Sequence, residues 1–358
     1  MNICLRVLVV TAIVHAATAA FCAPNKSAAK GERSANEVEA ATRLQVYLDR
    51  AEFAPGKIDG RYGDFTRKAL ALYRESRGEQ QERPPGSADA KKTPDVAGLD
   101  LTSVDPVFIP YTVTGDDLAQ TGELPDAVEE QAQLKALPYR SAAEAVAEKF
   151  HSDADFLEEL NPGRMKNLKA GDELKVPNVE PFDLAAVKDM KPGSETTAPA
   201  AANETGGEND AATSTPERSD ASAPPVAVFV DTATNMATVR HGEKIVAAYP
   251  VTIGSSETAS PIGDWKVRGV AKLPTFRYDE QMLQHGERGN HFFMLPPGPN
   301  SPVGVVWIAL NKKGIGLHGT NEPDAVGRGA SHGCIRLANW DVVRLAAKVK
   351  AGVPVAIH

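Results

Sequence analysis

The residues with the clearest capacity for chemistry lie between His318 and Arg336. The chain has three cysteines, and one of them, Cys334, lies in the run SHGCIRL at residues 331–337. A thiol attacks a carbonyl carbon as the thiolate, and a neighbouring imidazole is the usual group that removes its proton near neutral pH. Two histidines could serve as that base: His332, two residues before Cys334, and His318, sixteen residues before it. The pattern therefore predicts nucleophilic catalysis by a cysteine.

The glycines of this region indicate how the backbone would support such a reaction. Gly319 and Gly333 let the chain approach a substrate closely, and the amides that flank Cys334 are natural hydrogen-bond donors to an oxyanion. The two motif segments contain no acidic or amide side chain beside their histidines. We therefore expect a backbone carbonyl to orient the catalytic imidazole.

Two other interpretations of Cys334 compete with catalysis. A free cysteine is most often a small buried hydrophobic residue with no reaction to perform. His318, His332 and Cys334 could also bind zinc, but no fourth ligand and no C-x-x-C pair accompanies them. We expect neither a metal nor a cofactor at this site. Arg336 is either a contact for substrate or loop, or a plain salt-bridge partner.

Short strands and one late helix must position these residues. Apolar runs predict strands at 227–230, 236–240, 244–253, 265–270, 305–310 and 353–357. A helix capped by Asn339 would place five apolar residues on one face: Val342, Val343, Leu345, Ala346 and Val349. Tyr278, His291 and Trp307 lie on segments that could border the cleft around Cys334. Single aromatic residues in a β-rich domain are, however, more often part of the core. The pattern predicts a mainly-β, sandwich-like domain with one C-terminal helix.

Composition bounds the rest of the chain. Its 358 residues suggest about two or three domains, and its net charge of −8 excludes the basic surface typical of nucleic-acid binding. No apolar run approaches the ~20 residues of a membrane span. Residues 1–23 have the pattern of a secretory signal, in which Arg6 precedes an apolar stretch and then small residues. A short membrane anchor that stays attached is the alternative.

Two segments without large apolar residues, 76–95 and 192–225, predict a division into modules. The predicted linkers are 76–106 and 188–225. The predicted bodies are 35–75, 107–181 and 226–358. The first is expected to be a small α-helical module. The second is expected to be an α+β module in which Ser141 and Glu144 form a capping box at the start of a helix.

The C-terminal body resembles the YkuD-type L,D-transpeptidase catalytic domain. His-Gly-Thr at 318–320, followed by Ser-His-Gly-Cys-x-Arg-Leu at 331–337, is similar to that family's signature. SPIG at 260–263 and GPNSPVG at 298–304 resemble its turn and loop. The resemblance implies a nucleophile at Cys334, a base at His318, an orienting carbonyl at Gly319, oxyanion donors at Gly333 and Cys334, a pocket-holding His332, and substrate contacts at Ser331 and Arg336.

The two N-terminal bodies carry resemblances of their own. LQ at 44–45, PG at 55–56 and IDGRYG at 58–63 resemble the helical peptidoglycan-binding domain type 1. A helical hairpin that only spaces domains is the alternative. YTV at 111–113 and FLEELNP at 156–162 are similar to a LysM repeat, with an insertion between Val113 and Ser141.

Together these resemblances imply an enzyme exported to the periplasm or cell envelope that acts on peptidoglycan stems and glycan strands. Cys334 would attack the carbonyl of the third residue of a tetrapeptide stem, release D-Ala and pass the acyl group to an amine. That amine would belong to a second stem, giving a 3→3 crosslink, or to an envelope protein such as a lipoprotein. Water as acceptor would make the protein an L,D-carboxypeptidase, and a silent site would leave a peptidoglycan-binding adaptor. Carbapenem-type lactams are expected to acylate Cys334.

Overall fold

The computed structural model describes residues 33–79, 93–192, 225–254, 259–285, 288–329, 331 and 333–358. The predicted signal at residues 1–23 lies outside them, as do residues 80–92 and 193–224 of the predicted linkers. The described helices and strands belong to one unit, Ala35–His358. Among these helices, none combines the length and the apolarity that crossing a bilayer requires.

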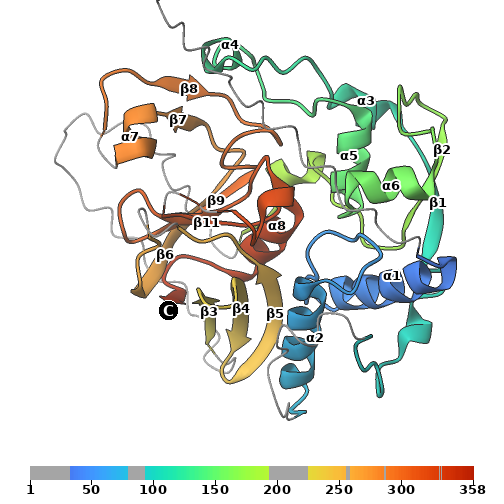
Figure 1. Ribbon diagram of the computed structural model, residues 1–358. Coiled ribbons are helices and arrows are strands. Elements are labelled where there is room, and N and C mark those ends of the chain that lie inside the picture. Colours follow the sequence, from blue (N-terminus) through green and yellow to red (C-terminus); the bar gives the residue numbers. More distant parts are fainter. Residues whose placement is uncertain are drawn as a thin grey trace, which may run out of the picture. The chain divides into compact units, whose positions relative to one another are not determined.

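An eight-stranded curled sheet organises the C-terminal part of the chain (Figure 1). Its strands are β3 (Val226–Asp231), β4 (Met236–His241), β5 (Lys244–Pro250), β6 (Gly263–Lys272), β9 (Val306–Leu310), β10 (Gly316–His318), β11 (Ile335–Arg336) and β12 (Pro354–Ile357). They lie in the order β11-β10-β9-β6-β12-β3-β4-β5. The predicted mainly-β class is confirmed. The expected sandwich is instead one hydrogen-bonded sheet, because β6 pairs with both β9 and β12 and so joins its two halves.

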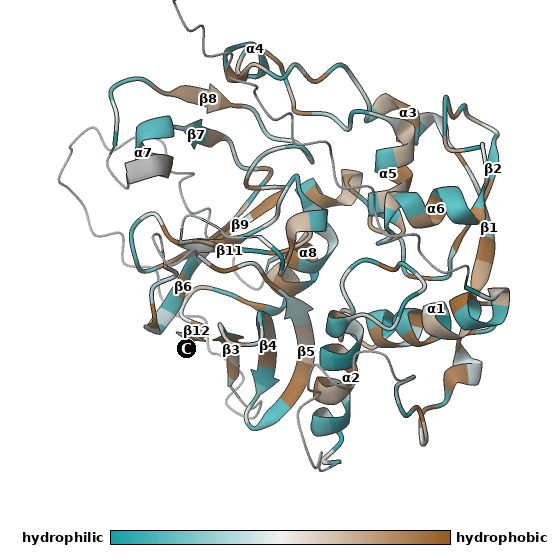
Figure 2. Ribbon diagram, in the orientation of Figure 1, coloured by the Kyte–Doolittle hydropathy of each residue, from teal (hydrophilic) through white to brown (hydrophobic). Residues whose placement is uncertain are grey.

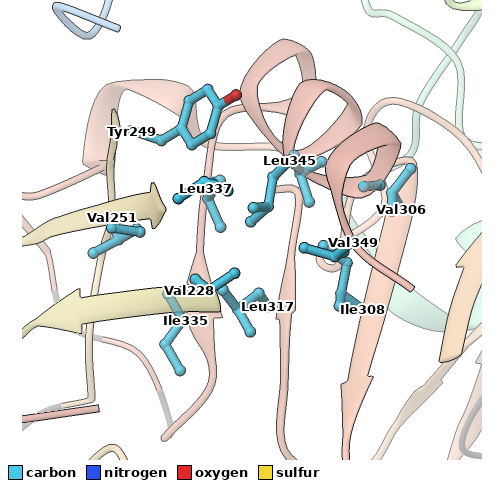
Figure 3. Packing of buried hydrophobic residues seen from close by; sticks show 14 of the residues in the cluster. Val228, Tyr249, Val251, Val306, Ile308, Leu317, Ile335, Leu337, Leu345 and Val349 are labelled. Atoms are coloured by element: carbon cyan, nitrogen blue, oxygen red, sulfur yellow. The ribbon is translucent and has the colours of Figure 1, made fainter. Parts of the chain in front are cut away.

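Helix α8 (Asn339–Lys348) covers the buried face of this sheet. Its apolar residues recur every three or four positions, which places them on one side of the helix. Figure 3 shows Leu345 and Val349 directed at Ile308 of β9 and Leu317 of β10. All four side chains are buried. The sheet and helix thus form a packed support beneath the other face of the sheet, which carries His318.

A small hairpin stands apart from the large sheet, between β6 and β9 in the chain (Figure 1). It consists of β7 (Phe276–Tyr278), α7 (Glu280–His285) and β8 (Phe293–Leu295). Asp279 fixes it by pairing with Arg277 at 2.8 Å and by accepting the Gly289 N–H at 2.9 Å. The sequence did not predict this hairpin, since strands of three residues are too short to show an alternating pattern.

The N-terminal half contains α1 (Ala35–Arg50) and α2 (Asp64–Ser76), followed by β1 (Phe108–Thr112) paired antiparallel with β2 (Glu173–Pro177). Between β1 and β2 lie α3 (Gly115–Ala119), α4 (Val128–Gln131), α5 (Ala142–Lys149) and α6 (Ala154–Leu160). Hydrophobic and hydrophilic residues alternate along α1 and α2, as in amphipathic helices (Figure 2). The Ser141 side chain accepts the Glu144 N–H, which is one half of the predicted capping box, but the Glu144 carboxylate accepts the N–H of Arg140 instead of that of Ser141. Helices α3 and α4 occupy the predicted insertion.

A buried polar cluster joins elements from all three predicted bodies. Asp49, near the end of α1, accepts two hydrogen bonds from Arg344 of α8, at 2.9 and 3.1 Å. It also contacts His151 Nδ1 at 3.0 Å, and the His151 ring stacks on Trp340 at 5.2 Å between centroids. Asp49 and His151 are buried. Buried contacts therefore link elements of the three predicted bodies.

We expect Asp49→Ala to lower the free energy of unfolding by about 3–5 kcal/mol, because it leaves the largely buried cation of Arg344 without this partner. Glu39→Ala removes one exposed ion pair within the same helix, with Arg43, and should change stability by only about 0.5 kcal/mol. Urea denaturation of both variants measures the difference. A loss below about 1 kcal/mol for Asp49→Ala would show that the cluster is not a structural junction.

Candidate functional site

Strand register gathers the candidate catalytic residues on one face of the sheet. His318 of β10 lies opposite Arg336 of β11 and opposite Trp307 of β9. Directly paired residues point to the same face of a sheet, and so do residues two apart along a strand. Cys334, two residues before Arg336, therefore shares this face. The alternate residues point into the core and are buried: Ile308, Leu317 and Ile335.

The imidazole of His318 is held in one orientation. Its Nδ1 lies 2.6 Å from the carbonyl oxygen of Gly319, and its ring stacks on Trp307 with centroids 5.0 Å apart and planes 10° apart. A carbonyl oxygen can only accept, so Nδ1 carries the proton and Nε2 keeps a lone pair. Gly316 makes room for this stack, because a Cβ there would lie 2.8 Å from the Trp307 ring. His318 is thus oriented as a proton acceptor through Nε2.

Burial keeps both the histidine and the cysteine uncharged. It lowers the pKa of His318 to about 3, and the positive charge of Arg336 acts in the same direction, against the Gly319 hydrogen bond. It raises the pKa of Cys334 to about 11, against a hydrogen bond from the Gly316 backbone and the charge of Arg336. At neutral pH the site therefore holds a neutral imidazole and a protonated thiol. A thiolate would have to form during the reaction, by transfer of the proton to a base.

A pocket of about 210 Å³ opens over this face. Cys334, His318, Trp307 and Arg336 form its floor, and the β7–β8 hairpin contributes a wall. The other lining residues are Pro274, Thr275, Phe276, Arg277, Tyr278, Asp279, Met282, Leu283, Arg288, Pro302, Val303 and Gly314. Cys334 is partly exposed, and its Sγ lies 3.6 Å from the Gly314 carbonyl oxygen. A substrate carbonyl that enters this pocket can reach the sulfur.

The turn before Cys334 is held by Ser331. The Ser331 hydroxyl donates to the Cys334 carbonyl oxygen and accepts the Gly333 N–H at 3.2 Å. Gly333 has a φ of 103°, a conformation that favours glycine. Ser331 is buried and is not one of the residues that line the pocket. Its expected contact with substrate stays a prediction, as does the oxyanion role of Gly333. His332 lies outside the described residues.

The structure also brings in residues that sequence patterns assigned elsewhere. Trp307 and Tyr278 line the pocket, although lone aromatic residues are more typical of a core. Sequence patterns favoured a core position for Trp307, but the apolar residues at alternate positions of β9, Val306, Ile308 and Leu310, are a signal that could have placed it on the opposite face. Nothing in the sequence pointed to Arg277 or Arg288. Within the described part of the chain, no group of three or more His, Cys, Asp or Glu side chains is arranged to hold a metal ion.

Comparison with known proteins places this site in a family. The family model of the YkuD L,D-transpeptidase catalytic domain matches residues 225–357. The Bacillus subtilis protein YqjB, named as an L,D-transpeptidase, is 31% identical over 135 residues, which are 36% of this chain and 69% of YqjB. The chain belongs to the L,D-transpeptidase family. The matched segment contains the large sheet, α8 and all the residues that line the pocket.

Other members of the L,D-transpeptidase family match over a smaller share of their length. YkuD of Bacillus licheniformis is 31% identical over 115 residues, which are 32% of this chain and 54% of YkuD. The alignment thus spans about half of that relative. The solved structure of an L,D-transpeptidase from Mycobacterium smegmatis is 19% identical and aligns over 38% of this chain and 59% of that chain, with a TM-score of 0.31. The family model leaves residues 33–192 unmatched.

Proposed function

We propose that this protein is a peptidoglycan L,D-transpeptidase that uses Cys334 as its nucleophile. The observation that carries the proposal is the placement of a partly exposed thiol and an oriented imidazole, with its Nε2 lone pair, in one pocket. The donor is a tetrapeptide stem, attacked at the carbonyl of its third residue. Membership in the L,D-transpeptidase family supports this choice of substrate.

In the acylation step, His318 Nε2 takes the thiol proton as the Cys334 sulfur bonds to the carbonyl carbon. The tetrahedral intermediate collapses, the C–N bond to D-Ala breaks, and the imidazolium returns its proton to the leaving amine. An acceptor amine then attacks the thioester, loses a proton to His318 and restores the thiol. No external energy source is needed, because the thioester conserves the acyl-transfer potential of the original amide. The Gly319 carbonyl keeps the required tautomer throughout, since it can bind only a protonated Nδ1.

The oxyanion of the intermediate requires nearby backbone donors. We assign this role to the N–H groups of Cys334 and Gly333. The Gly333 N–H at present donates to Ser331 Oγ at 3.2 Å, so its use requires that bond to be exchanged for one to substrate. We assign His332 to holding the pocket and Ser331 to contacting substrate as well as supporting the turn. Arg336, which lines the pocket, is assigned to binding substrate.

The charge of the pocket favours an acidic donor. Among the described residues that line it, three are arginines, Arg277, Arg288 and Arg336, and one is acidic, Asp279. Asp279 already binds Arg277 and the backbone N–H groups of Met282 and Gly289. The excess of positive charge suits a stem peptide, which ends in a carboxylate.

We expect Arg288→Gln to raise KM for the tetrapeptide donor by about 3–10-fold while kcat stays within about twofold, because a partly solvated charge contact contributes mainly to binding. Arg268→Gln on β6 is the matched control, since Arg268 is exposed and does not line the pocket. Steady-state kinetics with an isolated stem measure both constants. An unchanged KM for Arg288→Gln would remove Arg288 from substrate binding.

We further assign residues 35–75 to a peptidoglycan-binding module and residues 107–181 to a LysM-like module of an envelope or periplasmic enzyme. The helical pair α1–α2 and the strand–helix–helix–strand arrangement of β1, α5, α6 and β2 support these assignments. Residues 1–23 are assigned as the export signal. The acceptor is a second stem or the amine of an envelope protein.

Mass spectrometry of tetrapeptide muropeptides, incubated with wild type or Cys334→Ala, tests the proposal. The expected product is a dimer whose mass is that of two monomers less one D-Ala, formed only by wild type. Tripeptide without dimer would favour the L,D-carboxypeptidase alternative or a missing protein acceptor. No change with either protein, together with binding to purified sacculi, would overturn catalysis and favour the adaptor.

A further inference from the structure

A buried amide side chain, that of Asn339, lies against Gly319, the residue that follows His318. Asn339, the first residue of α8, is fully buried. Its Oδ1 accepts the Val305 N–H at 3.1 Å, and its Nδ2 donates to Glu148 Oε1 at 3.0 Å and to the Pro299 carbonyl at 3.2 Å. Both polar atoms of this side chain thus have hydrogen-bond partners. Because Oδ1 faces a donor and Nδ2 faces two acceptors, the amide cannot be flipped.

Asn339 is in close contact with the peptide that orients His318. A Cβ added to Gly319 would lie 2.2 Å from Asn339 Oδ1, and one added to Gly304 would lie 2.1 Å from it. The two glycine backbones therefore pass against each other and against this oxygen, where no side chain fits. The carbonyl of Gly319 accepts from His318 Nδ1. Movement of Asn339 would shift the acceptor that sets the tautomer and the angle of the imidazole.

The group that holds Asn339 comes from outside the matched catalytic segment. Glu148 lies on α5, is buried, and accepts at Oε1 from Tyr139 Oη at 2.9 Å as well as from Asn339. The chain before α5 also contacts the loop that leads to Gly304. The Leu137 N–H donates to the Pro297 carbonyl at 2.9 Å, and Asn300 Nδ2 donates to the Pro138 carbonyl at 2.7 Å and to Glu144 at 2.9 Å.

We propose that Glu148 and Asn339 are positioning residues for His318, so that the segment 107–181 completes the catalytic site as well as any role it has in wall binding. The inference rests on the proposed acyl transfer for its biological meaning. Its geometry is independent of that reaction. Glu148 acts through Asn339 on Gly319, and Gly319 acts on the imidazole.

The charge state of Glu148 fits this role. Burial raises the pKa of Glu148 to about 8, opposed by the hydrogen bonds from Asn339 and Tyr139, and the charge of Glu144 raises it further. These are the titratable groups that act on Glu148 within the described part of the chain, since Asn339 carries no charge. Glu148 is therefore a neutral acid near pH 7 and becomes a buried anion above about pH 8. Glu148→Gln keeps a neutral acceptor for both donors at every pH.

The test measures alkylation of Cys334 by iodoacetamide, a reaction that needs no peptidoglycan. We expect Glu148→Ala to slow alkylation at pH 7 about tenfold in the wild-type background and less than about twofold in the His318→Asn background, because residues that act through one another are not additive. Glu148→Gln keeps an acceptor for Asn339 and Tyr139 and should match wild type at pH 7 within about twofold. Glu144→Gln, one helical turn earlier and bound to Asn300, is the control and should stay within about twofold of wild type.

If Glu148→Ala slowed alkylation equally in the wild-type and His318→Asn backgrounds, the proposal would be overturned, because Glu148 would not act through His318. The proposal would also be overturned if Glu148→Ala were alkylated at the wild-type rate, or if Glu144→Gln were alkylated as slowly as Glu148→Ala. If Glu148→Ala does not fold, the same comparison in the two backgrounds is made with Glu148→Asp, whose shorter side chain withdraws the acceptor from Asn339, and equal losses of rate in the two backgrounds again count against the proposal. Failure of wild type to crosslink muropeptides would contradict the proposed function and leave these alkylation rates unaffected.

Discussion

Replacement of Cys334 by alanine is expected to lower the rate of D-Ala release by about 10⁴-fold or more. The sulfur forms the covalent bond in the proposed reaction, and Cys334 is the one thiol among the described residues that line the pocket. What remains would come from substrate binding and backbone donors alone. Chromatographic quantification of D-Ala from a tetrapeptide stem gives the rate. The same variant should show no mass adduct with a carbapenem.

The matched control is Cys334→Ser, which keeps the approximate volume and replaces the sulfur by a much weaker nucleophile. Because Cys334 is partly exposed, the free energy of unfolding of both variants should lie within about 1 kcal/mol of the wild-type value. A Cys334→Ala protein that released D-Ala at more than about a hundredth of the wild-type rate would contradict a cysteine mechanism. Retained binding of this variant to purified sacculi would separate wall binding from catalysis.

The second large effect is expected at His318. His318→Asn should lower kcat by about 10²–10⁴-fold, because it removes the base that takes the thiol proton and returns it to the leaving amine. The pH dependence of wild type provides a signature of this base. Below its pKa of about 3 the imidazole would be protonated and unable to accept, and above a pKa of about 11 the thiol would be ionised already. The pH profile of kcat/KM for wild type is therefore expected to stay level from about pH 5 to pH 7.5.

An inflection near pH 6.5 would contradict this expectation, since it would mean that His318 titrates as an exposed imidazole does. Initial rates of D-Ala release by wild type, measured across this pH range, give the profile. His318→Gln should give the same loss as His318→Asn, because neither amide side chain accepts a proton.

The local elements of the fold could be read from the sequence because they depend on neighbouring residues. Apolar runs predicted β3, β4, β5, β6, β9 and β12, and a spacing of three and four predicted the buried face of α8. The β7–β8 hairpin could not be predicted, since its strands are too short to show a pattern. The division into three bodies followed from linker composition, which carries no information on whether Asp49 and His151 meet Arg344 across those bodies.

The sequence by itself determined the chemical identity of the site: a thiol at Cys334, two histidines in reach of it, and glycines where the backbone must come close. Only the tertiary structure decided that His318 Nδ1 is bound to the Gly319 carbonyl, that Trp307 stacks on the ring, and that Glu148 supports the arrangement from α5. Residue types and short spacings are properties of the chain, whereas these contacts depend on how the folded backbone sets the angle of the ring and on contacts as distant in sequence as Glu148 with Asn339. Burial, which sets the pKa of His318 and of Cys334, is likewise a property of the folded protein alone.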